Sequence, residues 1–255
     1  MIRLTTLFSG SSGNAVLIDN GEDALLVDCG VSGKRLCEKL NESEISRLRA
    51  LLVTHEHSDH IAGVGVVSRK WKLPVYATDG TFGAFPCVDK LTETKTVCDK
   101  ENFRVGSIRV TPFHIPHDAA EPVGYRFSDG ENEVGLATDM GFMNRALIRN
   151  LIGCESVLLE ANHDLKMLAE GPYPYYLKQR IGGTQGHLSN RTAAISSILL
   201  AEHGTKRILL GHLSQENNTP RLAYETVEKA LFDRGFQIDE NIVLGVAKKE
   251  GRSEA

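Results

Sequence analysis

Residues 54–60 read Thr-His-Glu-His-Ser-Asp-His and place three imidazoles and two carboxylates within one short stretch. Imidazole nitrogens and carboxylate oxygens are ligands for Zn²⁺ and similar divalent ions. The chain has nine histidines in 255 residues, so a chance cluster of three at a polar strand end is a poor explanation. The stretch therefore indicates a metal site.

The neighbouring residues predict how this stretch is positioned. An apolar run at 50–53 indicates a short buried strand that ends where the polar residues begin. Side chains two apart in an extended segment point the same way, so His55 and His57 can bind one ion together. A helix beginning directly afterwards would turn Asp59 and His60 toward a second position beside the first. The spacing thus fits two neighbouring metal ions.

Three further polar side chains follow apolar segments elsewhere in the chain. Asp28, Asp139 and His212 each come at the end of a run that predicts a strand. Taken singly, the two aspartates also fit ordinary strand-end or turn positions. An α/β scaffold gathers its site residues from strand ends and the loops after them, so these segments can meet at one site.

The wider pattern predicts two sheets enclosed by helices. Several strands come first, and strands interleaved with helices follow, which suggests two sheets between helix layers. Neither an internal repeat nor a linker divides the chain, so we expect a single domain over residues 1–250 and a loose tail at 251–255. The expected strands cover residues 2–8, 15–18, 24–27, 50–53, 73–77, 97–110, 123–127, 133–138, 156–160, 207–210 and 242–246. The expected helices cover residues 33–40, 145–151, 190–202 and 221–232, together with one that starts at 58 or 59 and continues through 61–71.

Composition narrows the setting of the protein. Hydrophobic residues make up 41% and charged residues 24% of the chain, as in ordinary globular proteins. No run approaches the ~20 apolar residues of a membrane helix, and the N-terminus lacks a signal-peptide pattern. The five cysteines are scattered and form no C-x-x-C pair, which disfavours a disulfide framework and a cysteine-built zinc site. We therefore expect a cytoplasmic protein without a membrane partner.

The motif His55-x-His57-x-Asp59-His60 resembles the H-x-H-x-D-H motif of the metallo-β-lactamase superfamily. Segments at 9–14, 63–66, 117–125 and 216–220 are similar to the YycJ/WalJ-type branch of that superfamily. The resemblance covers roughly residues 4–246 and implies the αββα four-layer sandwich of this family.

The resemblance also implies a complete set of ligands for two divalent ions. His117, rather than His114 three residues earlier, matches the family histidine that joins His55 and His57. Asp139 matches the aspartate shared by both ions, and His212 would complete the second group. The full set of ligands implied is His55, His57, Asp59, His60, His117, Asp139 and His212. Asp28 is implied to orient one of these ligands by a hydrogen bond without contacting the metal itself. Mixed nitrogen and oxygen donors suit Zn²⁺ or Mn²⁺, and Fe²⁺ also fits them.

Further residues are candidates for substrate chemistry. His187 resembles the histidine that phosphodiesterases of this superfamily direct at the scissile phosphate, and Glu160 could orient its ring. A helix-capping histidine beside a solvated glutamate is the alternative, and His163 is a second candidate for the histidine. Ser12 and Asn14 belong to a glycine-containing loop whose backbone N–H groups could bind a phosphate, although a flexible turn also explains that loop.

The implied activity is that of a dinuclear metal-dependent hydrolase. The branch resemblance favours a nuclease, namely a 5′-to-3′ DNA exonuclease with a metal-bridging hydroxide as nucleophile and Asp59 orienting it or accepting its proton. DNA is the favoured partner and RNA a second one; the net charge of −4 neither indicates nor excludes either. The segment 173–180, with three tyrosines and two cations, could clamp a strand or be a packed surface segment.

Two other functions fit the same motif. A hydrolase of small thioesters or lactones would use the same fold and ligands. A metal-containing binding or regulatory module without turnover is a third hypothesis, which the complete ligand set disfavours. The sequence predicts no particular oligomeric state.

Overall fold

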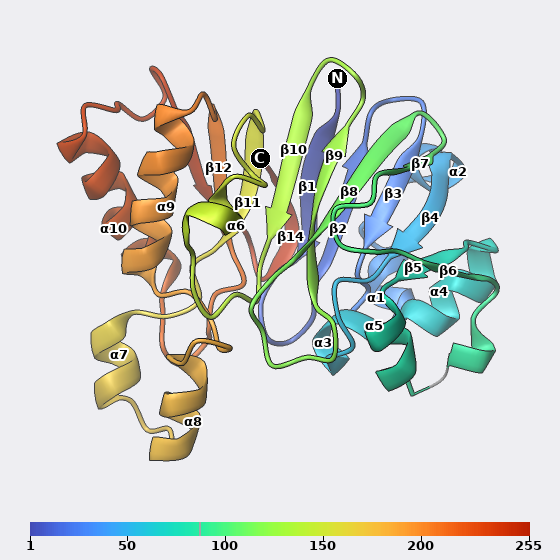
Figure 1. The fold of residues 1–255 in the computed structure, drawn as a ribbon, viewed down its shortest axis with the longest axis horizontal. Coiled ribbons are helices and arrows are strands. Elements are labelled where there is room, and N and C mark those ends of the chain that lie inside the picture. The colour runs from blue at the N-terminus through green and yellow to red at the C-terminus, as the bar shows by residue number, and fades with distance from the viewer. Residues whose placement is uncertain (87) are drawn as a thin grey trace.

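The computed structural model describes residues 1–86 and 88–255 and contains two β-sheets with helices on their outer faces (Figure 1). This arrangement is the αββα sandwich that the sequence predicts. Cys87 lies outside the described residues, and the four described cysteines are all free thiols. None of the helices formed by the described residues has the length and apolar character needed to cross a membrane.

Each sheet has seven strands and combines parallel with antiparallel pairs. In spatial order the first sheet consists of β14 (Glu250–Glu254), β1 (Arg3–Phe8), β2 (Ala15–Asp19), β3 (Ala24–Val27), β4 (Leu48–Leu52), β5 (Val75–Ala77) and β6 (Thr94–Thr96). The second consists of β13 (Val243–Val246), β12 (Arg207–Gly211), β11 (Ser156–Glu160), β10 (Glu133–Ala137), β9 (Val123–Ser128), β8 (Ile108–His114) and β7 (Phe103–Val105).

The helices form two groups, one for each sheet. Beside the first sheet lie α1 (Gly33–Cys37), α2 (Glu42–Arg47), α3 (Ser58–Ile61), α4 (Val64–Trp71), α5 (Asp79–Ala84) and the single turn η1 (Val88–Lys90). On the side of the second sheet lie α6 (Arg145–Ile148), α7 (Leu165–Glu170), α8 (Tyr175–Ile181), α9 (Asn190–Glu202) and α10 (Pro220–Asp233). The pair α7 and α8 extends below the sheets in Figure 1.

Strand β3 shows why the central strands are continuous apolar runs. All four of its residues are buried, because side chains alternate between two covered faces. Leu25 and Val27 belong to the core between the two sheets, together with residues such as Ile108 and Leu209 of the second sheet. Ala24 and Leu26 belong to the core between the first sheet and its helices.

A buried tyrosine of the second sheet forms a hydrogen bond to the backbone of the first, next to the 54–60 stretch. Tyr125 of β9 is completely buried, and its hydroxyl donates a hydrogen bond of 2.8 Å to the carbonyl of Val53, directly before the 54–60 stretch. In Tyr125→Phe that carbonyl loses its buried partner, so we expect a free energy of unfolding lower by about 1–2 kcal/mol. Thermal unfolding followed by circular dichroism should show a Tm lower by roughly 2–8 °C.

Tyr76→Phe is the matched control, because the described residues offer the Tyr76 hydroxyl no hydrogen-bond partner and its ring stacks on Phe103. Equal shifts in the two variants would show that the hydroxyl bridge of Tyr125 contributes nothing.

Three predicted segments differ from the structure. The helix predicted from 58 or 59 to 71 does begin at Ser58 but is divided into two helices, α3 and α4, and the strand predicted at 97–110 is divided between β7 and β8. The tail predicted to be loose at 251–255 instead forms most of β14, which pairs antiparallel with β1. Arg252 in this strand forms an ion pair of 2.7 Å with Glu44, and this contact between distant segments is not visible in the local sequence.

The parallel strands bring the candidate ligands to one edge of the sandwich. Strands β3 and β4 run parallel in the first sheet, and β10, β11 and β12 run parallel in the second. The carboxyl ends of parallel strands share an edge, where α/β proteins commonly bind ligands. Directly after these strands come Asp28, the 54–60 stretch, Asp139 and His212, while Glu160 is the last residue of β11.

Candidate metal centre

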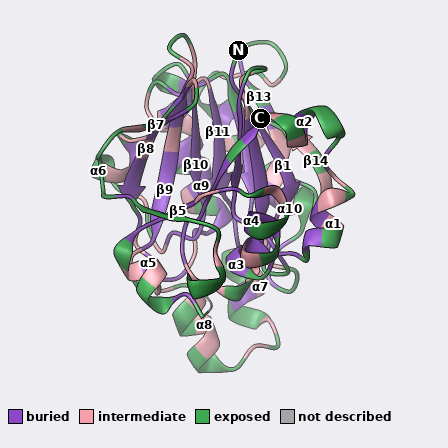
Figure 2. Cartoon of the chain, turned by 90° about the vertical axis from the view of Figure 1, so that its right-hand side faces the viewer, coloured by how far each residue is buried: buried purple, intermediate pink, exposed green. Residues whose placement is uncertain are grey.

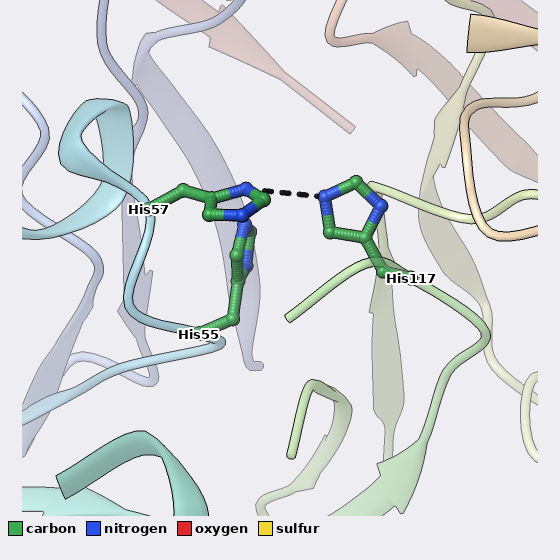
Figure 3. A group of neighbouring side chains, drawn as sticks. All are labelled: His55, His57 and His117. Atoms are coloured by element: carbon green, nitrogen blue, oxygen red, sulfur yellow. Dashed lines mark hydrogen bonds between the residues drawn. The ribbon is translucent and has the colours of Figure 1, made fainter. Parts of the chain in front are cut away.

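His55, His57 and His117 face one another across the junction of the two sheets (Figure 3). His55 and His57 follow β4, whereas His117 lies on the loop after β8. The Nδ1 atom of His57 is 3.3 Å from the Nε2 atom of His117. Two ligands about 2.1 Å from one tetrahedral ion would be separated by roughly 3.4 Å, so this spacing fits a shared ion. His114, in contrast, is exposed at the end of β8.

Hydrogen bonds orient the rings of this first group. Nδ1 of His117 donates to the carbonyl of Gly186 at 3.1 Å, which leaves its Nε2 facing the other two histidines. Nδ1 of His55 is 3.0 Å from the hydroxyl of Thr54, and its Nε2 is buried with no hydrogen-bond partner among the described residues. A partner on one ring nitrogen that leaves the other free is typical of metal-binding histidines.

Asp59, His60 and His212 form a second group of possible ligands. Oδ2 of Asp59 lies 3.5 Å from Nε2 of His60 and 3.6 Å from Nε2 of His212. Behind this group, Oδ2 of Asp28 accepts a hydrogen bond of 2.8 Å from Nδ1 of His60. Asp28 thereby directs Nε2 of His60 toward Asp59.

Asp139 lies between the two groups. Its Oδ1 is 3.3 Å from Nδ1 of His212 and 3.9 Å from Nε2 of His117, while its Oδ2 is 3.5 Å from Nε2 of His60. Oδ2 is buried and has no hydrogen-bond partner in the described part of the chain. Its two oxygens therefore face histidines of both groups.

Three of these strand-end residues have a left-handed backbone. The φ angles of Asp28, Asp139 and His212 are 59°, 60° and 55°. Residues other than glycine seldom adopt this region, and aspartate and histidine tolerate it better than most. The conformation costs of order 1–3 kcal/mol at each position and tends to occur at functional sites. It bends the chain sharply at the end of each strand and turns these side chains into the cluster.

Burial and mutual contact shift the protonation of the cluster in the metal-free protein. Burial, followed by the nearby His60, lowers the pKa of His55 well below its ordinary value. For Asp59 burial acts to raise the pKa, but the nearby rings of His212 and His60 outweigh it and hold the pKa well below its usual range. For His212 burial acts to lower the pKa, yet the nearby carboxylates, Asp139 first and then Asp59, raise it to about 10. A divalent cation that binds here would displace protons from the histidines.

Glu160 is completely buried and bonds both rings of a histidine pair. Its Oε1 accepts from Nδ1 of His187 at 2.8 Å and from Nδ1 of His212 at 3.0 Å. Its Oε2 accepts from the N–H groups of Met140 and Leu188. Burial acts to raise the pKa of Glu160, but His187 and these hydrogen bonds hold it well below its ordinary value. The carboxylate is therefore charged and fully satisfied, and it fixes the orientation of both histidines.

A cavity of about 230 Å³ opens onto the cluster. Its wall includes His187, whose Nδ1 is occupied by Glu160, so that Nε2 is the ring atom available to a ligand. Arg180 of α8 also lines it and is fixed by an ion pair of 2.5 Å with Asp118. Asp118, Asn162 and Ser214 also line this cavity, and the sequence pattern does not indicate them as site residues.

The two loop residues predicted to bind substrate occupy different positions. Asn14 is buried, and its amide nitrogen lies 3.2 Å from Oδ2 of Asp59 and 3.0 Å from Nε2 of His60, among the candidate ligands. Ser12 is exposed, and the neighbouring Ser11 lines the cavity instead. His163, the second candidate for the role of His187, is buried away from this cavity wall, and burial lowers its pKa to about 4.

The donor atoms fit a divalent metal ion. Nε2 of His55, Nε2 of His212 and Oδ2 of Asp139 are all buried without hydrogen-bond partners among residues 1–86 and 88–255. An unpaired buried polar group costs about 1–3 kcal/mol, so three of them in one cluster call for ligands that satisfy them. Divalent cations bound by imidazole and carboxylate would do so.

The chain belongs to the metallo-beta-lactamase superfamily, whose family model matches residues 9–212. It is 38% identical to exodeoxyribonuclease YycJ of Bacillus anthracis over 246 residues, which cover 94% of this chain and 92% of that protein. It is 39% identical to exodeoxyribonuclease WalJ of Streptococcus pneumoniae serotype 2 over 249 residues, which cover 93% of this chain and 91% of that protein.

A solved structure supports the same fold. The metallo-beta-lactamase fold protein YhfI from Bacillus subtilis matches with a TM-score of 0.76 and 19% sequence identity, over 99% of each chain. Family membership and the histidine and aspartate clusters together indicate binding of divalent metal. The chain is thus a YycJ/WalJ-type member of its superfamily.

The contacts of Glu160 lead to a testable prediction. In Glu160→Gln one carboxylate oxygen becomes an –NH₂ group, which cannot accept a hydrogen bond. If it replaces Oε1, the two histidine rings lose their acceptor; if it replaces Oε2, the two backbone N–H groups lose theirs. We expect a 10–100-fold loss of Zn²⁺ affinity, measured by competition with a chromogenic chelator. Glu225→Gln, on the exposed face of α10, is the matched control and should bind as the wild type does. Unchanged affinity in Glu160→Gln would show that Glu160 does not position His212 for metal.

Proposed function

We propose that this chain is a dinuclear metal-dependent phosphodiesterase that degrades DNA from its 5′ end. The observation that carries the proposal is the pair of ligand groups, His55–His57–His117 and Asp59–His60–His212, with Asp139 between them. Identities of 38% and 39% over more than nine-tenths of the chain, to relatives named exodeoxyribonucleases, support DNA as the substrate.

The donor set suits Zn²⁺ or Mn²⁺, and Fe²⁺ fits the same atoms. When bound, two such ions lower the pKa of a shared water and neutralise charge on the phosphate under attack. We propose His55, His57 and His117 as the ligands of one ion and Asp59, His60 and His212 as those of the other. Asp139 would contribute one oxygen to each ion.

Two side chains of the cavity would move protons. Oδ2 of Asp59 lies between the second-group histidines and would orient the attacking water or accept its proton. His187 has Nε2 free, and its Nδ1 donates a hydrogen bond to Glu160, which fixes the orientation of the ring. We propose that Nε2 of His187 donates a hydrogen bond or a proton toward the leaving oxygen.

Helix α8 and the loop before it border the cavity and support contact with a nucleic-acid strand. Tyr173 of that loop and Arg180 of α8 line the cavity itself. Tyr175 and Tyr176, the first two residues of α8, are 76% and 74% exposed, and this helix is drawn as exposed and intermediate in Figure 2. Aromatic rings beside cations can stack on bases and contact phosphates.

We also propose that the protein is cytoplasmic. The four described cysteines are free thiols, as is usual in a reducing compartment.

The competing function is hydrolysis of a small thioester or lactone, and a substrate panel separates the two. The Zn²⁺- or Mn²⁺-loaded protein is incubated with 5′-phosphorylated DNA, with RNA of the same sequence, and with a thioester and a lactone. We expect cleavage of DNA at the highest rate and slow or no turnover of the esters. Rapid turnover of an ester with both nucleic acids left intact would overturn the proposed function.

A further inference from the structure

A second cavity, of about 390 Å³, lies beside the one that opens onto the metal cluster. We call it the α9 cavity, and its wall consists of Gly141, His163, Leu165, Gly182, His187, Ser189, Arg191, Thr192 and Ile195. His187 lines both cavities, so the two adjoin at that ring. The wall of the metal cavity contains three aspartates, whereas the described residues contribute no carboxylate to the α9 cavity. Its only formally charged side chain among them is Arg191.

His163 is an unsatisfied polar side chain in this wall. It is only 2% exposed, and its Nδ1 is buried with no hydrogen-bond partner among the described residues. Its backbone is firmly held, because its carbonyl accepts from the N–H of Asn190 at 2.8 Å. A buried imidazole without a partner costs free energy that a bound ligand can recover.

The amino end of α9 contributes a second attraction for anions. This helix has 13 residues, and its N-cap is Ser189, whose hydroxyl accepts from the N–H of Thr192. The N–H of Arg191 has no acceptor in the described part of the chain. The partial positive charge of a helix amino terminus favours phosphate groups.

The side chain of Arg191 is available for binding. It is exposed and forms neither an ion pair nor a side-chain hydrogen bond with any described residue. Arg180, in contrast, is tied to Asp118. A free guanidinium, a helix amino end and an unpartnered imidazole thus meet around one cavity without a negative group. This combination matches a phosphate, which accepts several hydrogen bonds and carries negative charge.

We propose that the α9 cavity binds a backbone phosphate of the DNA strand, next to the phosphate under attack at the metal centre. The inference rests on the proposed nuclease function, and His187 marks the boundary between the two phosphate positions. Arg191 and His163 would therefore bind substrate without taking part in bond cleavage. They would set how strongly a strand is held and would favour polymers over small phosphodiesters.

The test compares a polymer with a substrate that fills only the metal centre. Steady-state kinetics are measured for a 5′-phosphorylated oligonucleotide and for the p-nitrophenyl ester of thymidine 5′-monophosphate. In Arg191→Ala we expect the KM for the oligonucleotide to rise roughly tenfold, because one hydrogen bond from a charged group to the strand is lost. We expect kcat, and both constants for the small ester, to stay within about twofold. The slope of log Kd against log salt for oligonucleotide binding should become shallower by about one unit.

Controls separate this inference from the function on which it rests. Arg207→Ala removes the same charge at the opposite end of β12 from His212 and should match the wild type. His163→Phe keeps a ring in the wall but removes both nitrogens, and it should weaken oligonucleotide binding without changing turnover of the small ester. Oligonucleotide affinity is also measured by fluorescence anisotropy without turnover, so it does not depend on catalysis.

Each outcome decides between the two ideas. If the wild type cleaves the oligonucleotide but Arg191→Ala binds it with unchanged affinity and salt slope, the α9 cavity is not a phosphate subsite. The same conclusion follows if Arg191→Ala slows the small ester as much as the oligonucleotide. If the wild type cleaves neither substrate, the proposed nuclease function fails; unchanged anisotropy binding in Arg191→Ala would then overturn the subsite as well.

Discussion

Replacing Asp139 with asparagine should reduce metal-dependent cleavage of DNA roughly a thousandfold while the fold stays intact. Asp139 has oxygens facing histidines of both ligand groups, and Oδ2 is buried without a partner in the described chain. Asparagine offers one oxygen and one –NH₂, so it cannot serve two cations. A loss of about 4 kcal/mol of transition-state stabilisation, typical of lost metal assistance, corresponds to this factor in kcat/KM.

The asparagine variant isolates chemistry from folding. Asparagine has nearly the same shape as aspartate and tolerates the left-handed backbone, in which Asp139 has a φ of 60°. The far-ultraviolet circular dichroism spectrum should therefore match that of the wild type. Asp233→Asn, on the exposed end of α10, changes the same charge and should cleave at the wild-type rate. Retention of more than a tenth of the activity in Asp139→Asn would contradict the shared-ligand role.

Loading the metal-free protein with Zn²⁺ should raise its Tm by roughly 5–10 °C. Binding only to the folded state stabilises it by about 2.7 kcal/mol at a free ion concentration of 100 Kd, and each kcal/mol corresponds to roughly 2–4 °C for a chain of this size. The physical reason is the group of unpartnered buried atoms on His55, His212 and Asp139, which a bound cation satisfies. Differential scanning fluorimetry across a Zn²⁺ titration measures the shift, and a chelator should reverse it.

Histidine variants test whether the stabilisation comes from this cluster. His57→Asn removes a half-buried ligand candidate and should lose at least half of the shift. His203→Asn changes an exposed histidine at the end of α9 and should keep the whole shift. If both variants respond to Zn²⁺ as the wild type does, the ion binds elsewhere.

The fold and much of the cluster were predictable because most of the candidate ligands come at or shortly after the end of a strongly apolar strand. Runs such as 25–27 and 208–210 are buried on both faces, which makes their ends visible as an abrupt change to polar residues. The strand pattern does not distinguish His117 from His114 as a candidate ligand, and the family motif selected His117. In the structure His117 is buried beside His57, and His114 is exposed.

Other features depend on contacts that no local pattern encodes. The left-handed backbone at Asp28, Asp139 and His212 involves no glycine and so leaves no sequence signal. Whether Ser11 or Ser12 lines the cavity depends on the conformation of one loop. The pairing of β14 with β1 joins the two ends of the chain, and its exposed, charged sequence resembles a loose tail.

The most direct test of the account follows degradation of 5′-phosphorylated duplex DNA by metal-analysed protein, with and without Mn²⁺, beside Asp59→Ala. Strands labelled at the 5′ or the 3′ end show the direction of digestion. The account predicts release of nucleotides from the 5′ end that requires metal and is lost in Asp59→Ala. Protein that binds two ions yet leaves DNA and RNA uncut would contradict it, as would equal cleavage by the variant.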